Sequence, residues 1–377
     1  MKKIANDSIF FIVNDVDFFI SHRLVVALEA QKLGFDVHVI SGSSGSVSII
    51  ESFGFVFHFV DFKRRGVFNF LKTLTGLFSI FSIFRPSIVH AITIKPILAT
   101  GFISLLFGDI KVIYAFSGLG TVFVSKGVFA AYRKYFVELV LRVFLRSGNV
   151  SVIFQNEADQ HYFVSRNLVA VEKCVLFHGS GVDLDHFCYS DEPKDRFVVT
   201  MASRLIRQKG VFDFVSAAEI INNLALEIEF QLIGDLDLGN DSSLTRSELG
   251  HLRSLSYIKV IGYQDDVAPF YAASSIVCLP SYREGLPKCL SEAAACGRPV
   301  VTTDVPGCRD AVIDGVTGIL VPVRNPVLLA SAIIKLYQDD LLRLEMGRAA
   351  RELAEKRFDR NMIADQHCQL YLRILGI

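Results

Sequence analysis

The sequence feature that most restricts the fold is a regular alternation between short apolar runs and longer segments with helical periodicity. The short runs are continuously apolar, which is typical of strands buried on both faces of a parallel sheet. The alternation stops once, in the polar residues 183–196, and then begins again. It therefore predicts an α/β protein with two doubly wound domains joined near this segment. The expected strands are 9–13, 36–40, 55–60, 87–92, 111–116 and 150–154 in the first half, and 197–201, 229–233, 257–261, 275–279 and 299–303 in the second.

Two domains also agree with the length, because 377 residues exceed what one hydrophobic core usually supports. We place the first domain at 1–190 and the second at 191–360. Ligands of doubly wound sheets bind beyond the carboxyl ends of the strands, so we expect two domains that face each other across a cleft, with the site in that cleft.

Composition excludes several classes of protein. Hydrophobic residues make up 51% and charged residues 21% of the chain, which argues against disorder. The 39 Lys and Arg equal the 39 Asp and Glu, so a general nucleic-acid binder is not expected. Seven scattered cysteines without a C-x-x-C favour neither a disulfide framework nor a zinc site. These features suit a protein of a reducing, cytoplasmic compartment.

The first half nevertheless contains a strongly basic region. Between residues 63 and 146 there are twelve Lys and Arg against two acids, Asp109 and Glu138. The helical segments 66–84 and 128–146 interleave apolar and basic residues, and either rest on anionic lipid or present an apolar stripe to the core with solvated cations on the other face. No signal peptide is expected at the N-terminus. Because 66–84 contains Lys72 and several Ser and Thr, we expect a buried or surface helix and not one that crosses a membrane.

The most informative segment for chemistry is 281–297. It follows an apolar strand, turns at Gly285 and opens a helix at Pro287, where proline is tolerated. The first N–H groups of that helix, at Lys288 and Cys289, would form an anion site. Glu284 and Glu292 could accept hydrogen bonds from sugar hydroxyls. On spacing alone, two solvated glutamates on an amphipathic helix explain the pattern equally well.

The E-x7-E from Glu284 to Glu292, with its surrounding residues, resembles the signature of the family 4 retaining glycosyltransferases of the GT-B fold. It is similar in particular to that of bacterial enzymes that build O-antigen, capsule or other glycans on polyprenyl diphosphate. The resemblance implies that Glu284 contacts the donor sugar and that Glu292 holds the ribose hydroxyls. It places Gly285, Leu286, Lys288 and Cys289 beside the nucleotide sugar. It also implies that residues 361–377 form a helix that crosses back to the first domain.

A second match lies after the first strand of the second domain, where Arg204 and Lys209 form an R-x4-K pair. A departing phosphate needs fixed cations, and Arg and Lys on a strand–helix loop supply them. The resemblance implies that this pair binds the donor diphosphate. It also implies that the backbone at Gly262 faces the base.

Gly234 begins a segment, 234–237, that contains a D-x-D, which would indicate a metal site in a one-domain glycosyltransferase. Here we interpret the D-x-D as a strand-end turn, because Arg204 and Lys209 can already neutralise the diphosphate. We therefore expect no metal and no cofactor apart from the donor substrate.

In the first domain, Gly118 and Gly120 follow a strand and His90 lies near the end of another. These residues resemble positions that face the acceptor and the sugar in the same family. We consider His90, or alternatively His22, as the group that orients the attacking hydroxyl. A structural histidine is the competing interpretation of His90.

The sequence therefore predicts a retaining hexosyltransferase that uses a nucleotide-diphosphate sugar, with uridine favoured, and a polyprenyl-diphosphate-linked saccharide. It would work as a peripheral protein on an anionic membrane, at its cytoplasmic face. Two alternatives remain open: a non-hydrolysing sugar-nucleotide epimerase, and a non-catalytic protein that binds nucleotide sugars.

Overall fold

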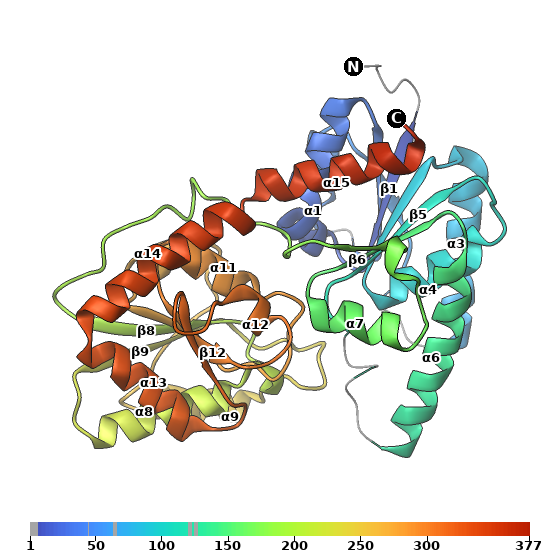
Figure 1. Ribbon diagram of the computed structural model, residues 1–377. Helices are drawn as coiled ribbons and strands as arrows, with labels where there is room; N and C mark the ends of the chain where they lie inside the picture. Colours follow the sequence, from blue (N-terminus) through green and yellow to red (C-terminus); the bar gives the residue numbers. More distant parts are fainter. Residues whose placement is uncertain (1–6, 44, 63–65, 120–122, 124–126) are drawn as a thin grey trace. The chain divides into compact units, whose positions relative to one another are not determined.

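The computed structural model describes residues 7–43, 45–62, 66–119, 123 and 127–377. The chain divides into two compact units (Figure 1). Unit 1 comprises Met1–Ser180 and Asn361–Ile377, and unit 2 comprises Gly181–Arg360. Each unit is built on its own parallel sheet, so the predicted α/β class with two Rossmann-like domains is confirmed.

The sheet of unit 1 has the strand order β3-β2-β1-β4-β5-β6-β7 within the described residues. All neighbouring strands are parallel, and the order reverses direction between β1 and β4, as in doubly wound folds. Its strands are β1 (Ser8–Val13), β2 (Asp36–Ser41), β3 (Val56–Phe59), β4 (Ile88–Ile92), β5 (Lys111–Phe116), β6 (Val150–Phe154) and β7 (Cys174–Leu176). Its helices are α1 (Val16–Leu33), α2 (Val47–Ser52), α3 (Val67–Phe84), α4 (Ile94–Ser104), α6 (Val128–Arg146), α7 (Glu157–Ser165) and the short η1 (Val171–Lys173).

Helix α15 (Arg360–Leu375) covers part of the same sheet, together with α1 (Figure 1). Its apolar stripe, which includes Ala364, Cys368 and Tyr371, belongs to one buried cluster with Phe11 of β1 and Ala27 of α1. Residues from the two ends of the chain therefore share one core in unit 1.

The sheet of unit 2 has the order β10-β9-β8-β11-β12-β13, again with parallel neighbours. Its strands are β8 (Phe197–Ala202), β9 (Ile228–Ile233), β10 (Lys259–Gly262), β11 (Ile276–Leu279), β12 (Val300–Thr303) and β13 (Gly318–Val321). Its helices are η2 (Arg207–Lys209), α8 (Val211–Asn223), α9 (Arg246–Ser254), α10 (Ala268–Ala272), α11 (Lys288–Ala295), α12 (Cys308–Ala311), α13 (Pro326–Gln338) and α14 (Asp340–Arg357).

The boundary between the units lies at residue 180, ten residues before the boundary expected from the sequence. Residues 181–190 belong to unit 2 because they bind to its last residues. The N–H of Val182 donates to the carbonyl of Phe358 at 2.6 Å, and Arg360 forms an ion pair with Asp183 at 2.7 Å. Polarity marks the linker in the sequence but does not show which domain its residues pack against.

Helix α3 is the one helix of the described chain that is long and apolar enough to cross a membrane, and 17% of it is buried. Thr73, Leu77 and Phe81 form its buried stripe, and Leu77 and Phe81 pack into the core beneath the sheet. Phe70, Leu74 and Ile80 pack against that core half-buried, whereas Phe68 and Ile83 are among the exposed apolar side chains of α3.

Candidate functional site

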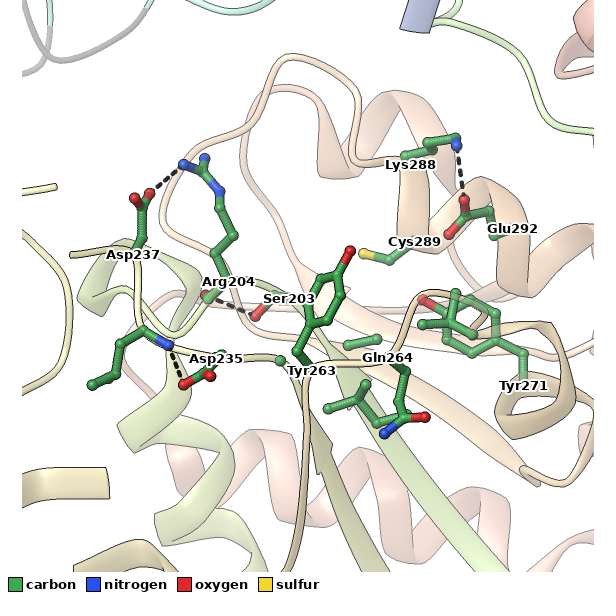
Figure 2. A pocket seen from close by; sticks show the side chains of 15 residues that line it. Ser203, Arg204, Asp235, Asp237, Tyr263, Gln264, Tyr271, Lys288, Cys289 and Glu292 are labelled. Carbon is green, nitrogen blue, oxygen red and sulfur yellow. Dashed lines mark hydrogen bonds and ion pairs between the residues drawn. The ribbon is translucent and has the colours of Figure 1, made fainter. Parts of the chain in front are cut away.

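The candidate site is a cavity of about 550 Å³ in unit 2 (Figure 2). Its walls come from the segments that follow β8, β9 and β10, from α10 and from the first turns of α11. These segments lie at the carboxyl ends of the strands, where ligands of doubly wound sheets bind. The cavity is lined by Ala202, Ser203, Arg204, Ile233, Gly234, Asp235, Leu236, Asp237, Tyr263, Gln264, Val267, Tyr271, Lys288, Cys289 and Glu292.

Glycine is required where two of these segments meet. Gly234 has φ +134°, and a Cβ there would collide with the carbonyl oxygen of Ser203. The N–H of Gly234 donates to the carbonyl of Gly262 at 2.8 Å. This close backbone contact holds the ends of β8, β9 and β10 together and leaves the cavity open above them.

Helix α11 begins at the cavity wall. Pro287 is its N-cap residue, and the helix starts at Lys288. The first N–H groups of any α-helix have no partner within the helix, so this end of α11 favours an anion. A backbone hydrogen bond holds the preceding loop in place, because the N–H of Glu284 donates to the carbonyl of Pro306 at 3.2 Å.

The two sequence motifs lie next to each other. The N–H of Tyr282 and the hydroxyl of Ser281 both donate to the carbonyl of Gln208, at 2.8 and 3.0 Å. Lys209 Nζ lies 2.6 Å from Glu284 Oε1, which also accepts from the hydroxyl of Ser281 at 2.6 Å. The R-x4-K and E-x7-E motifs therefore form one structural unit, although 75 residues separate Lys209 from Glu284.

Three ion pairs surround this region. Besides Lys209 and Glu284, Arg204 Nη1 lies 2.6 Å from Asp237 Oδ2. Lys288 Nζ lies 3.3 Å from Glu292 Oε1, one helical turn away. Each of the three cations has an acidic partner, and each pair belongs to unit 2.

Burial differs between these pairs and perturbs their protonation. The side chains of Lys209 and Glu284 are 17% and 12% exposed, whereas that of Arg204 is 63% exposed. Burial lowers the pKa of Lys209, but the adjacent Glu284 raises it further, so that its net shift is upward and it stays charged. Burial raises the pKa of Glu292, and Lys288 partly opposes that shift. Burial also raises the pKa of the Cys289 thiol, which is therefore protonated at neutral pH.

The structure brings most of the predicted donor-site residues together. Arg204, Gly234, Lys288, Cys289 and Glu292 line the cavity. The other five members of the set lie on segments that adjoin the cavity without lining it: Lys209, Gly262, Glu284, Gly285 and Leu286. Their assignment to donor binding stays a prediction.

The prediction for His90 needs correction. Its side chain is fully buried in unit 1, where Nδ1 lies 2.8 Å from the hydroxyl of Tyr371 on α15. Burial holds the pKa of His90 well below its usual value, with smaller contributions from His367 and Arg23. A neutral imidazole enclosed in the core cannot reach an acceptor hydroxyl, so His90 is structural.

The other first-domain positions give a mixed outcome. His22 lies on α1, half-buried, where it stacks on Phe18 with ring centroids 4.3 Å apart. Gly118 follows β5 and has φ +93°, a conformation that favours glycine. Gly120, together with the basic residues 63–65, lies outside the described residues.

Sequence reasoning missed several cavity residues, among them Gln264, Val267 and Tyr271. Asp237 was taken only as part of a turn, yet it pairs with Arg204 inside the cavity. Asp235 does form the expected local contact, since its Oδ1 accepts from the N–H of Leu236 at 2.7 Å. In the described part of the chain, no group of three or more His, Cys, Asp or Glu side chains is arranged to hold a metal ion.

Comparison with known proteins agrees with this geometry. The family described as "Glycosyl transferases group 1" matches residues 196–339, and the family described as "Glycosyl transferase 4-like" matches residues 8–156. The first match contains the whole cavity, and the second contains most of the sheet of unit 1. The chain is a glycosyltransferase with one domain of each of these two families.

Relatives of this glycosyltransferase are bacterial enzymes named for capsular polysaccharide biosynthesis or for acceptors linked to diphospho-undecaprenol. It is 26% identical to a capsular polysaccharide biosynthesis glycosyltransferase of Staphylococcus aureus, over 90% of each chain. It is 27% identical to the N,N'-diacetylbacillosaminyl-diphospho-undecaprenol α-1,3-N-acetylgalactosaminyltransferase of Campylobacter jejuni, over 70% of this chain and 72% of the relative. It is 24% identical to the UDP-Gal:α-D-GlcNAc-diphosphoundecaprenol α-1,3-galactosyltransferase of Escherichia coli, over 82% of each chain.

Among solved structures, a glycosyltransferase from Rickettsia africae matches 98% of this chain and 99% of its own, with a TM-score of 0.78 and 18% sequence identity. This similarity supports the GT-B fold of the glycosyltransferase.

Proposed function

We propose that this glycosyltransferase moves a hexose or an N-acetylhexosamine, with retention of configuration, from a uridine-diphosphate sugar to a saccharide on polyprenyl diphosphate. The observation that supports the donor is the cavity itself. It offers Arg204 and the start of α11 to a diphosphate, and Glu292 lies on that helix, where it can accept from ribose hydroxyls. The names of the relatives in Campylobacter and Escherichia support the lipid-linked acceptor.

In the proposed reaction, the sugar C1 becomes electron-poor as the nucleotide diphosphate leaves. Arg204 and the amides of Lys288 and Cys289 stabilise the charge that develops on the leaving group. Lys209, which is paired with Glu284, adds positive charge to the same region. Glu284 orients the sugar ring. The departing phosphate oxygen takes the proton of the acceptor hydroxyl, so the reaction needs no histidine base, in agreement with the buried state of His90.

The activity test uses purified enzyme, a panel of radiolabelled UDP-sugars, and undecaprenyl-diphosphate-linked saccharides. We expect label in the lipid fraction with one donor, and an α-linkage when the donor is an α-anomer. A new sugar nucleotide formed without acceptor would instead indicate an epimerase. Tight nucleotide-sugar binding without turnover on any lipid-linked acceptor would indicate a non-catalytic binding protein.

We further propose that unit 1 binds the anionic cytoplasmic face of the cell membrane through helices α3, α4 and α6. These helices form one layer, because the ring of Phe102 on α4 contacts Phe70 of α3 and Phe144 of α6, with centroids 6.0 and 5.0 Å apart. Large apolar side chains project outward from this layer. They include Phe68, which is 83% exposed, and Phe129, which is 91% exposed.

The charge of this layer matches an anionic surface. Lys72, Arg133, Lys134, Arg142 and Arg146 accompany the exposed apolar side chains. The one acidic residue of the three helices, Glu138, is buried and binds Arg166 at 3.4 Å. Exposed aromatic residues with basic neighbours are typical of helices that lie in the headgroup region of a bilayer.

Sedimentation with phosphatidylcholine vesicles, with and without phosphatidylglycerol, tests the membrane proposal. The variant Phe129→Ser with Tyr132→Ser should lose most of the sedimented fraction while keeping its melting temperature, because both side chains are exposed. Leu341→Ser on α14 is the matched control, since Leu341 is an exposed apolar residue of unit 2. Equal sedimentation of wild type and the α6 variant would contradict the proposal.

A further inference from the structure

The most exposed of the three ion pairs, between Arg204 and Asp237, lies inside the cavity (Figure 2). The pair is at one end of the cavity, and the Lys288–Glu292 pair is at the other. A nucleotide diphosphate whose ribose binds Glu292 would extend its phosphates along the start of α11 toward Arg204. Asp237 then competes with that diphosphate for the same guanidinium.

We infer that Asp237 is a latch that holds Arg204 until a diphosphate displaces it, and that this latch selects diphosphates over monophosphates. The inference rests on the proposed function, because it assigns Arg204 to the donor diphosphate. Asp237 acts only through Arg204 and is therefore a positioning residue.

Asp237 is held in place by contacts that do not involve Arg204. Its N–H donates to the hydroxyl of Ser243 at 3.0 Å, and its carbonyl accepts from the N–H of Asn240 at 2.8 Å. The side-chain amide of Asn240 also donates to Asp237 Oδ2, at 3.3 Å. The carboxylate therefore stays where the turn puts it, whether or not the arginine is present.

Arg204 is the movable partner. Its backbone is fixed, because the neighbouring Ser203 and Leu205 donate their N–H groups to the carbonyls of Ile233 and Asp235. Its side chain is 63% exposed, whereas that of Asp237 is 25% exposed. The guanidinium can therefore move from the carboxylate to a ligand in the cavity without any change of the backbone.

The strengths of the two contacts favour the exchange of Asp237 for a diphosphate on the Arg204 guanidinium. An exposed ion pair contributes little net free energy, whereas a charge-assisted, bidentate contact between Arg and a phosphate is stronger. A diphosphate that reaches the guanidinium therefore breaks the pair at a small cost. A monophosphate bound at the same nucleoside position is one phosphate shorter, so it leaves Arg204 on Asp237.

The test measures UDP and UMP affinity by calorimetry for wild type, Asp237→Asn, Arg204→Gln and the double variant. In the wild-type background we expect Asp237→Asn to tighten UDP binding about two- to five-fold, as the loss of an exposed pair predicts, and to leave UMP binding nearly unchanged. In the Arg204→Gln background the same substitution should have little effect on either nucleotide. Asp235→Asn is the matched control, because Asp235 lines the same cavity but binds its own turn.

The outcomes distinguish a failure of the proposed donor site from a failure of the proposed latch. If wild type binds none of UDP, GDP or ADP, the donor site itself is wrong. If UDP binds but Asp237→Asn changes nothing, or tightens UDP equally in the Arg204→Gln background, the latch is wrong and the donor site stands. Should Asp237→Asn fail to fold, ¹⁵N-arginine spectra of wild type replace it. The Arg204 resonance, identified by its loss in Arg204→Gln, should then shift with UDP and stay in place with UMP, and equal shifts would overturn the latch.

Discussion

The strand ends of unit 2 and the core around Arg23 in unit 1 hold their polar groups in different ways. In unit 2, three cations near the strand ends have a carboxylate within 3.3 Å: Lys209 with Glu284, Lys288 with Glu292, and Arg204 with Asp237. In unit 1, by contrast, the almost fully buried Arg23 donates to the carbonyl of His22 at 2.8 Å and lies near His90, His367 and Tyr371, and it forms no ion pair within the described residues.

This difference distinguishes functional from structural polar groups in this fold. Paired charges at strand ends can exchange one partner for a ligand, because their charge is compensated before and after binding. His90 and His367 lie in the core of unit 1, where burial lowers their pKa and keeps them neutral, so they offer neither charge nor access. The following predictions test whether this distinction holds.

The largest effect is expected for Glu284→Gln. The variant keeps the shape and the hydrogen bond from Ser281 but removes the charge that orients the sugar. We expect kcat to fall about 10²- to 10³-fold, the loss typical of removing one transition-state contact, with UDP affinity changed less than about three-fold. Steady-state kinetics and calorimetry measure the two quantities.

A paired acid elsewhere in unit 2 supplies the control for that result. Glu192 binds Arg343 at 2.9 Å, with both side chains 9% exposed, outside the cavity. Glu192→Gln should lower stability and leave kcat per folded molecule unchanged. A normal kcat for Glu284→Gln would remove Glu284 from the reaction.

The second prediction concerns acid stability and the core of unit 1. Burial, followed by Arg23, lowers the pKa of His367 to about 3. The unfolded chain binds that proton near pH 6.5 and the folded chain does not, so the stabilisation is complete above pH 6.5 and is lost as the pH falls toward 3. Each such histidine should reduce the free energy of unfolding by about 1.4 kcal/mol per pH unit in this window.

Urea denaturation between pH 7 and pH 5 measures this slope. Because His90 shares the same environment, His367→Gln should make the slope shallower without abolishing it. His161→Gln is the control, since His161 is exposed on α7. If His367→Gln leaves the slope as steep as in wild type, the core of unit 1 does not hold that histidine neutral.

These two predictions also show where sequence reasoning succeeds. The strands and the two motifs were predictable because apolar periodicity and motif spacing are local properties of the chain. The burial of His90 was not, because it depends on Tyr371, which is 281 residues away. The pairing of Arg204 with Asp237 likewise depends on a turn 33 residues later, and no spacing rule specifies it. Local patterns thus located the donor-site loops, while long-range packing decided which polar groups they expose.

A smaller effect is expected for Glu292→Gln. If Glu292 accepts from the ribose hydroxyls, its substitution should weaken UDP binding about five- to ten-fold, the loss expected for one hydrogen bond. Calorimetry with 2'-deoxy-UDP distinguishes this role from a general loss of charge. The deoxy nucleotide should bind wild type more weakly than UDP does and should be less sensitive to the substitution. An equal loss for both nucleotides would show that Glu292 does not contact the 2'-hydroxyl.

The smallest effect is expected from removing metal ions. If the cations of unit 2 and the start of α11 neutralise the diphosphate, EDTA should leave kcat/KM within about two-fold of its value, because these groups supply the compensation that a metal would provide. Asp235→Asn should be equally mild, since Asp235 binds the backbone of its own turn. Activity abolished by EDTA and restored by manganese, together with a large loss in Asp235→Asn, would instead make the D-x-D a metal site. In that case Asp237 would have to bind the metal as well as Arg204, and the ion pairs alone would no longer explain how unit 2 holds a diphosphate.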